Sequence, residues 1–122
     1  MRRLLGLAVL LPLTAVASPV YLKCTAETGD LRDVDVTVDE AINSVTQSIY
    51  PRKFEDVQFL PGEVRYRLTD RIASIRTTYE FTLDRKTLGL TRRLTVVGDY
   101  GQPSESSASS QCVVVDATDR KF

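Results

Sequence analysis

Few residues of this 122-residue chain could perform chemistry. The chain contains no histidine, so general acid–base catalysis would depend on paired carboxylates or on a lysine with a shifted pKa. The sequence pattern brings no two acidic residues into one pocket, and the serines of residues 104–110 have no evident base to activate them. We therefore predict that the protein is not an enzyme and has no catalytic residues.

Four acidic residues that lie close together in the sequence are Asp33, Asp35, Asp39 and Glu40. Carboxylate oxygens are the ligands that hard cations such as Ca²⁺ prefer. However, alternate positions of a strand place carboxylates along a line rather than around a centre, and the EF-hand spacing is missing. A solvent-exposed strand face explains these residues better, so we predict no metal site and no cofactor.

The two cysteines, Cys24 and Cys112, are predicted to form a disulfide, because paired cysteines are usual in exported proteins. Two buried free thiols are the alternative. Neither cysteine belongs to a Cys-x-x-Cys motif or has a histidine neighbour, so we expect a structural rather than a redox role.

Three residues are candidates for contact with a ligand or partner. Arg92 falls on the apolar side of an alternating segment, where a charged group is costly unless it is paired or lies at the mouth of a barrel. It could bind a ligand carboxylate inside a barrel, form an ion pair, or turn outward at a bulge. Tyr50 and Tyr100 lie in or beside predicted loops, where exposed aromatic side chains could anchor a partner.

Charge argues against nucleic acid as a partner, because 16 basic residues are balanced by 16 acidic residues. Four arginines nonetheless lie near one another in the sequence, at Arg65, Arg67, Arg71 and Arg76. They form either a basic stripe for an anionic partner or, as we favour, ion pairs with acids on adjacent strands.

Alternation of apolar and polar residues predicts strands along most of the chain. The predicted strands cover residues 20–25, 33–39, 45–49, 57–59, 64–68, 75–83, 88–96 and 111–115. Residues 39–43 are read as a hairpin loop rather than a helical turn, and residues 70–74 as a connection. Residues 98–110, rich in serine and glycine without an apolar period, are predicted to be a mobile loop, and residues 116–122 a polar tail.

Short connections between seven or eight strands favour an all-β antiparallel meander, forming a single domain over residues 18–122. A disulfide between the first and last strands requires these strands to be neighbours. A sheet that closes into a small barrel meets this requirement and is our prediction. A two-sheet sandwich also meets it and is the alternative.

The N-terminus has the features of a secretory signal peptide over residues 1–17. Arg2 and Arg3 precede an apolar run, and Ala15 and Ala17 are the small residues that signal peptidase recognises. The run is short for a membrane span, so we expect no stable membrane anchor after cleavage. The predicted location is the periplasm or the outside of the cell, and the mature chain would carry 14 basic and 16 acidic residues.

Several of these features resemble a group of small exported bacterial β-meander proteins that have no assigned activity. The resemblance covers most of the mature chain and lies in Cys24, the segment Val34-Thr37-Val38-Asp39-Glu40, the turn at residues 84–87, and Cys112. In that group glycine directly follows the threonine of the turn, whereas here Leu88 intervenes before Gly89. The outline is also similar to periplasmic inhibitors of c-type lysozyme, which are small bridged barrels, but their Ser-Gly-x-x-Tyr motif is not present.

These observations predict an exported, non-enzymatic interaction or inhibitor-like module that binds an envelope or extracellular protein through its loops. The alternative is a β-barrel carrier with a small molecule inside, since a barrel of eight strands either fills its interior or holds one ligand. A core packed by Phe59, Tyr66, Tyr79 and Phe81 would argue against a carrier.

Overall fold

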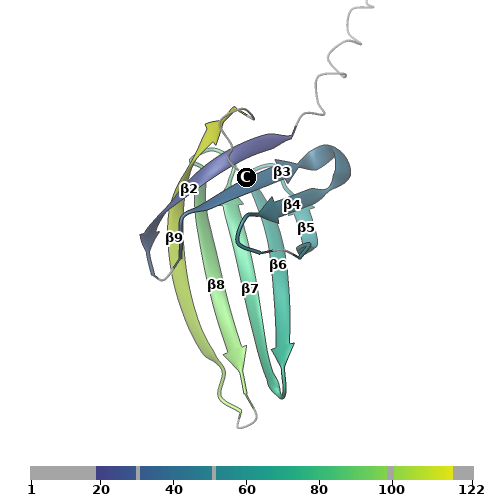
Figure 1. Cartoon of the computed structure of the whole chain (residues 1–122), viewed down its shortest axis with the longest axis vertical. Helices are drawn as coiled ribbons and strands as arrows, with labels where there is room; N and C mark the ends of the chain where they lie inside the picture. Colours follow the sequence, from purple (N-terminus) through teal and green to yellow (C-terminus); the bar gives the residue numbers. More distant parts are fainter. Residues whose placement is uncertain (1–18, 30, 51, 99–100, 117–122) are drawn as a thin grey trace, which may run out of the picture.

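The computed structural model describes residues 19–29, 31–50, 52–98 and 101–116, which form one antiparallel sheet (Figure 1). The strands are β2 (Val20–Thr28), β3 (Val34–Asp39), β4 (Ser44–Gln47), β5 (Glu55–Phe59), β6 (Glu63–Ile72), β7 (Ile75–Asp84), β8 (Gly89–Val97) and β9 (Ser104–Val115). Their order across the sheet is β4-β3-β2-β9-β8-β7-β6-β5. The prediction of an all-β meander is confirmed.

The sheet curls on itself, so that β2, β3 and β4 cross in front of β6–β9 (Figure 1). Continuous pairing from β3 through β2 and β9 to β8 makes this one nearly closed barrel rather than two packed sheets. Cys24 and Cys112 lie directly opposite each other in the β2–β9 ladder, and a disulfide joins them with their Cα atoms 3.9 Å apart. The predicted bridge between the terminal strands is therefore confirmed.

The barrel closes at the seam between β4 and β5 by side chains, because no ladder joins these two strands among the described residues. Asn43 donates its side-chain amide to the carbonyl of Val57 at 3.3 Å. Phe54, from the connection between β4 and β5, is 7% exposed, and its ring centroid lies 4.8 Å from that of Tyr66. Aromatic packing thus helps to hold the two edges of the seam together, as the backbone hydrogen bonds of a ladder would in a fully closed barrel.

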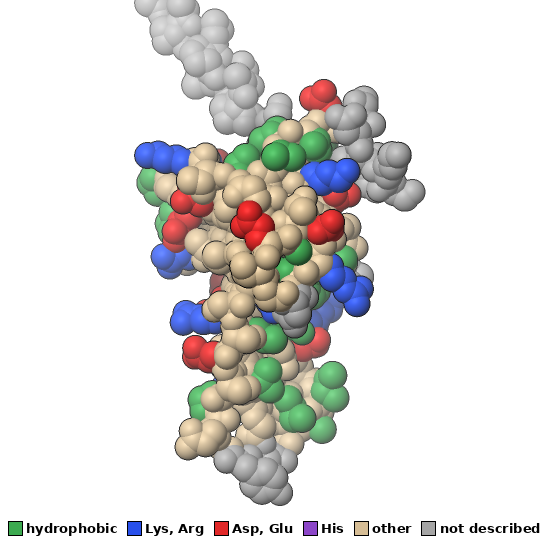
Figure 2. All heavy atoms as spheres, turned by 90° about the vertical axis from the view of Figure 1, so that its left-hand side faces the viewer, with side chains coloured by type: hydrophobic (Ala, Val, Ile, Leu, Met, Phe, Trp, Pro, Cys, Tyr) green, Lys and Arg blue, Asp and Glu red, His purple; other side chains and the backbone are tan. Residues whose placement is uncertain are grey.

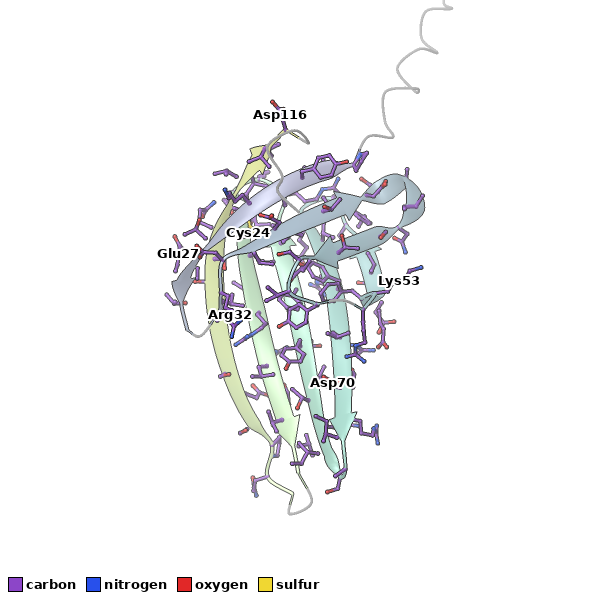
Figure 3. The ribbon with its side chains drawn as sticks, in the orientation of Figure 1. Cys24, Glu27, Arg32, Lys53, Asp70 and Asp116 are labelled. Atoms are coloured by element: carbon purple, nitrogen blue, oxygen red, sulfur yellow. A yellow bond between two sulfur atoms is a disulfide. The ribbon has the colours of Figure 1, made fainter. Side chains whose placement is uncertain are left out.

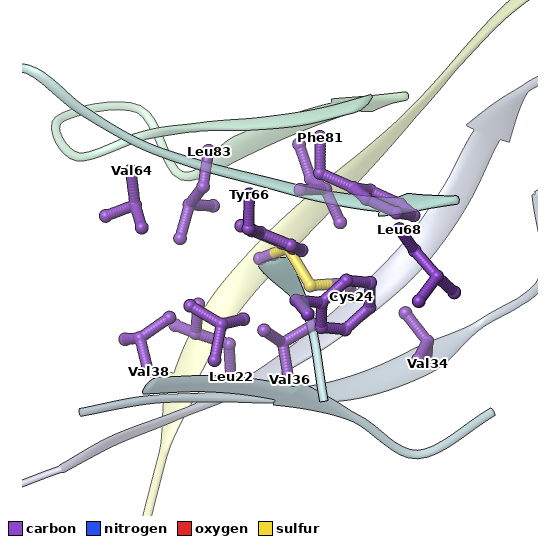
Figure 4. Close-up of a cluster of buried hydrophobic side chains, with 14 residues drawn as sticks. Leu22, Cys24, Val34, Val36, Val38, Val64, Tyr66, Leu68, Phe81 and Leu83 are labelled. Carbon is purple, nitrogen blue, oxygen red and sulfur yellow. A yellow bond between two sulfur atoms is a disulfide. The ribbon is translucent and has the colours of Figure 1, made fainter. Parts of the chain in front are cut away.

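The core lies between the two halves of the curled sheet (Figure 4). Valines and leucines of β2 and β3 face the inner side chains of β6 and β7; the labelled residues are Leu22, Val34, Val36, Val38, Val64, Tyr66, Leu68, Phe81 and Leu83. The ring of Tyr66 stacks on that of Phe81 with centroids 5.0 Å apart. Burial raises the pKa of the Tyr66 phenol, whose oxygen accepts a 2.7 Å hydrogen bond from the buried Gln47 amide.

Two predicted connections differ from the structure, and a third is confirmed. Residues 104–110 were predicted to be part of a mobile loop, but they belong to β9 and pair with β8 without a register shift. Residues 70–72 continue β6, and the turn is confined to Ala73, which has a φ of 56°, and Ser74. The predicted hairpin between β3 and β4 is confirmed, and its connection contains a short 3₁₀ turn, Glu40–Ile42.

Strands β6–β9 extend well beyond the rest of the barrel. We call this part the projecting sheet and define it as residues 69–72, 75–78, 94–97 and 104–107. Pairing of β5 with β6 ends at Arg67, and pairing of β2 with β9 ends at Ser109. Figure 3 shows Asp70 in this part, well below Cys24. The predicted signal peptide and residues 117–122 of the predicted tail lie outside the described residues.

Candidate functional site

The disulfide is a structural element rather than a reactive site. Cys24 is 0% and Cys112 is 1% exposed, so a second thiol has no access to either sulfur. Both lie in the interior of the sheet, where they join the hydrophobic core. Their effect is to fix β2 against β9, the step that brings the two ends of the meander together.

Arg92 is buried at 6% exposure on the inner face of β8, as the alternation predicted. In the register it lies between Phe81 of β7 and Ala108 of β9. Neither ladder shifts at this position, so the alternative of a bulge that turns Arg92 outward is wrong. Its proposed contact with a ligand carboxylate stays a prediction.

Tyr50 is a partly buried residue that packs against the core. Its ring lies in the aromatic cluster of the core, with centroids 5.8 Å from Phe54, 5.6 Å from Tyr79 and 6.1 Å from Phe81. The ring is therefore half-buried rather than fully exposed, and a partner contact at Tyr50 stays a prediction. Tyr100 lies outside the described residues.

Two of the four acidic residues near β3, Asp33 and Glu40, contact neighbouring protein groups. The described part of the chain contains no group of three or more histidine, cysteine, aspartate or glutamate residues arranged to hold a metal ion. Asp33 accepts a 2.9 Å hydrogen bond from the Ala26 amide, and Glu40 forms an ion pair with Arg85 at 3.0 Å. These carboxylates thus bind neighbouring protein groups.

The four arginines of the predicted basic stripe form two groups that differ in their ion pairing. Arg65 pairs with Glu63 and Arg67 pairs with Asp56, on the outer face of the barrel. These two belong to a shallow polar groove of about 590 Å³ that crosses β5–β9. Arg65, Arg67 and Arg93 of this groove each have a carboxylate beside them, so their charges are largely balanced.

Arg71 and Arg76 behave differently. They lie directly opposite each other in the β6–β7 ladder, on the outer face of the projecting sheet. Neither forms an ion pair with a carboxylate of the described residues. Like charges placed directly opposite destabilise a sheet, so this pair favours the approach of a negative group.

The inner face of the same hairpin ends in an exposed apolar pair, beyond the inner positions of Asp70 and Thr77. Ile72 is 72% and Ile75 is 46% exposed, and they pair with each other at the end of the ladder. Leu94 and Val96 of β8 share this face and are half-buried. Figure 2 shows hydrophobic side chains gathered at this lower end of the molecule.

Sequence reasoning missed this surface, although its signal is present. Residues 71–76 read Arg-Ile-Ala-Ser-Ile-Arg, two isoleucines around a two-residue turn with an arginine outside each. Reading residues 70–74 as a connection placed Ile72 in a loop, and the alternation across the turn was lost.

The fold and the bridge define a small, disulfide-linked, all-β protein made of one curled sheet. Comparisons of the chain with protein-family models, with curated proteins and with solved structures found no match. Among the described residues, no helix has the length and apolar character that crossing a membrane requires. The resemblances noted from the sequence stay predictions.

Proposed function

We propose that the protein is an exported, non-enzymatic interaction module that binds an extended segment of another envelope or extracellular protein at its projecting sheet. The observation that carries the proposal is the exposed apolar pair at the end of the β6–β7 hairpin, Ile72 at 72% and Ile75 at 46% exposure. Large isolated apolar side chains are ordinary on a surface, but a contiguous apolar face marks an interaction site.

The free edge of β6 supports an extended partner. Beyond Arg67 no described strand pairs with β6 on that side. The described contacts there both come from Arg52, a 3.4 Å hydrogen bond to the Thr69 carbonyl and a 3.1 Å ion pair with Asp70. Unpaired backbone groups of an edge strand are a template for strand addition. A strand bound there would extend the ladder and cover the exposed apolar pair.

Charge indicates the composition of the partner segment. Its side chains on the outer face would meet Arg71 and Arg76, which favour aspartate or glutamate. On the inner face they would meet Ile72, Ile75 and Val96, which favour apolar residues. An extended segment with alternating acidic and apolar residues therefore fits both faces.

Export and the lack of enzymatic function remain part of the proposal. The features of residues 1–17 and the disulfide favour an oxidising compartment. The stacked rings of Tyr66 and Phe81 occupy the centre of the barrel, which favours a binding module over a carrier with a ligand at that level.

Capture from envelope extracts by the purified protein tests the proposal. The variant Ile72→Ser/Ile75→Ser should lose the partner. The control is Ile42→Ser, because Ile42 lies at the far end of the molecule and has a matched exposure of 70%. A charge-reversed variant, Arg71→Glu/Arg76→Glu, should also lose the partner, while Lys23→Glu should retain it.

A partner held by the native protein and both controls, and released by both projecting-sheet variants, supports the proposal. The proposal would be contradicted if all variants retained the partner equally. It would also be contradicted if the native protein captured only further copies of itself. Thermal unfolding of each variant shows whether the barrel itself is intact.

A further inference from the structure

A second cavity lies at the opposite end of the barrel from the projecting sheet. It has a volume of about 340 Å³ and is bordered by side chains of β2, β3, β6 and β7. Its apolar wall includes Leu22, Val38, Val64 and Leu83, each less than 9% exposed overall. This volume is near the lower limit of small-molecule sites, which span roughly 300–1,000 Å³.

Two charged residues, Arg85 and Glu40, stand at the rim of this mouth pocket. Nη2 of Arg85 donates to a carboxylate oxygen of Glu40 at 3.0 Å. The side chain of Arg85 is 35% exposed and that of Glu40 is 59% exposed. The ion pair spans the mouth from the β3–β4 connection to the β7–β8 turn.

Arg85 is held in place independently of Glu40. Nη1 donates to the Leu60 carbonyl at 2.8 Å, and the guanidinium carbon lies 6.0 Å from the centroid of the Phe59 ring. The backbone amide of Arg85 donates to the Gly62 carbonyl at 3.0 Å. Arg85 would therefore keep its position at the rim if Glu40 moved away.

Glu40, by contrast, is an exchangeable partner. The side chain of Glu40 is described in contact with Arg85, and most of the Glu40 side chain is exposed to solvent. Exposed ion pairs contribute only about 0–1 kcal/mol, so another carboxylate can replace Glu40 at little cost. A guanidinium binds carboxylates well because its donors match both oxygens.

We propose that the mouth pocket binds a small aliphatic carboxylate. Its hydrocarbon chain lies against Leu22, Val38, Val64 and Leu83, and its carboxylate takes the place of Glu40 on Arg85. The site is separate from the projecting sheet and does not depend on the function proposed there.

Titration of the ¹⁵N-labelled protein with octanoate, followed by nuclear magnetic resonance, tests this inference. Octanoate should shift the amide resonances that surround the pocket, and octan-1-ol should bind more weakly because it lacks the charge. Arg85→Gln should weaken octanoate binding about tenfold, the loss expected when a charged hydrogen-bonding partner is removed. Glu40→Gln should strengthen binding severalfold, because the competing carboxylate is gone.

The matched control is Arg93→Gln, since Arg93 is also ion-paired, to Glu80 at 3.4 Å, but lies on the outer face. This variant should bind octanoate as the native protein does. The proposal is overturned by shifts located away from the pocket, by no shifts at millimolar octanoate, or by weaker binding in Glu40→Gln. If Arg85→Gln fails to fold, Glu40→Gln and octan-1-ol still decide the matter.

Discussion

Removal of the disulfide is the perturbation whose effect can be worked most directly from the structure. The bridge closes a loop with a sequence separation of 88 residues. The chain-entropy model gives such a loop a closure entropy of about 15 cal/mol/K, which is about 4.6 kcal/mol at 25 °C. Native disulfides of small domains typically contribute about 2–5 kcal/mol, so we expect the variant Cys24→Ala/Cys112→Ala to lose an amount in that range.

Urea unfolding followed by circular dichroism measures this loss. The denatured state of the variant is less constrained, so its dependence on urea should be steeper than that of the bridged protein. Addition of a reductant should lower the stability of the native protein and leave the variant unchanged. A loss below about 1 kcal/mol would refute the reasoning, because the loop would then contribute little to the entropy of the unfolded chain.

Three further predictions concern single contacts. Tyr66→Phe should destabilise the protein by about 1–3 kcal/mol, because it leaves the buried Gln47 amide without its acceptor. The double variant Gln47→Leu/Tyr66→Phe removes both partners, so urea unfolding should show part of the lost stability recovered. Hydrogen bonds from the backbone amides of Thr87 and Lys86 lower the pKa of Asp84. Its contribution to stability is therefore present above the ordinary aspartate pKa and is lost as the pH falls through the lowered value, and Asp84→Asn should remove that part of the acid dependence in urea unfolding. Gly29→Ala should destabilise the fold, because Gly29 has a φ of +76° and a Cβ there would lie 2.4 Å from the Cβ of Ala108. Adding Ala108→Gly should recover only part of the loss, since the added Cβ would still lie 2.9 Å from the Cα of residue 108 and the φ is unchanged. An unchanged thermal midpoint for Gly29→Ala would contradict this.

The sequence predicted most of the sheet because its inner positions alternate strictly. Val34, Val36 and Val38 are all buried, and each alternates with a more exposed residue, so both face and strand follow from the pattern. The disulfide added the one long-range constraint, that β2 lies beside β9. Together the alternation and the disulfide were enough to predict the meander and its closure into a barrel.

The first half of strand β9, residues 104–110, escaped prediction because it carries no apolar signal. Its inner positions there are Ser106, Ala108 and Ser110, and the last two are buried at 3% and 1% exposure. Gly29 of the neighbouring connection packs closely against Ala108, which leaves room for a small side chain only. Hydrophobic periodicity cannot detect a strand whose buried positions must be small.

The candidate surfaces were harder to predict because they depend on where strands end. The free edge of β6 and the exposure of Ile72 exist because β5 stops pairing at Arg67. The mouth pocket depends on a contact between Glu40 and Arg85, which are 45 residues apart in the chain. Local sequence pattern carries no information on either relation.

The position of β2 in the sheet also governs the order in which the chain can fold as it is made. β3 follows β2 closely, but β9 is the last strand, so one side of β2 has no partner until nearly the whole chain exists. The Cys24 thiol can pair with Cys112 only after the chain between them, a sequence separation of 88 residues, has emerged. Pairing between such distant segments is slow, and unpaired strand edges favour aggregation meanwhile. The newly made chain therefore has most need of a chaperone at its first strand.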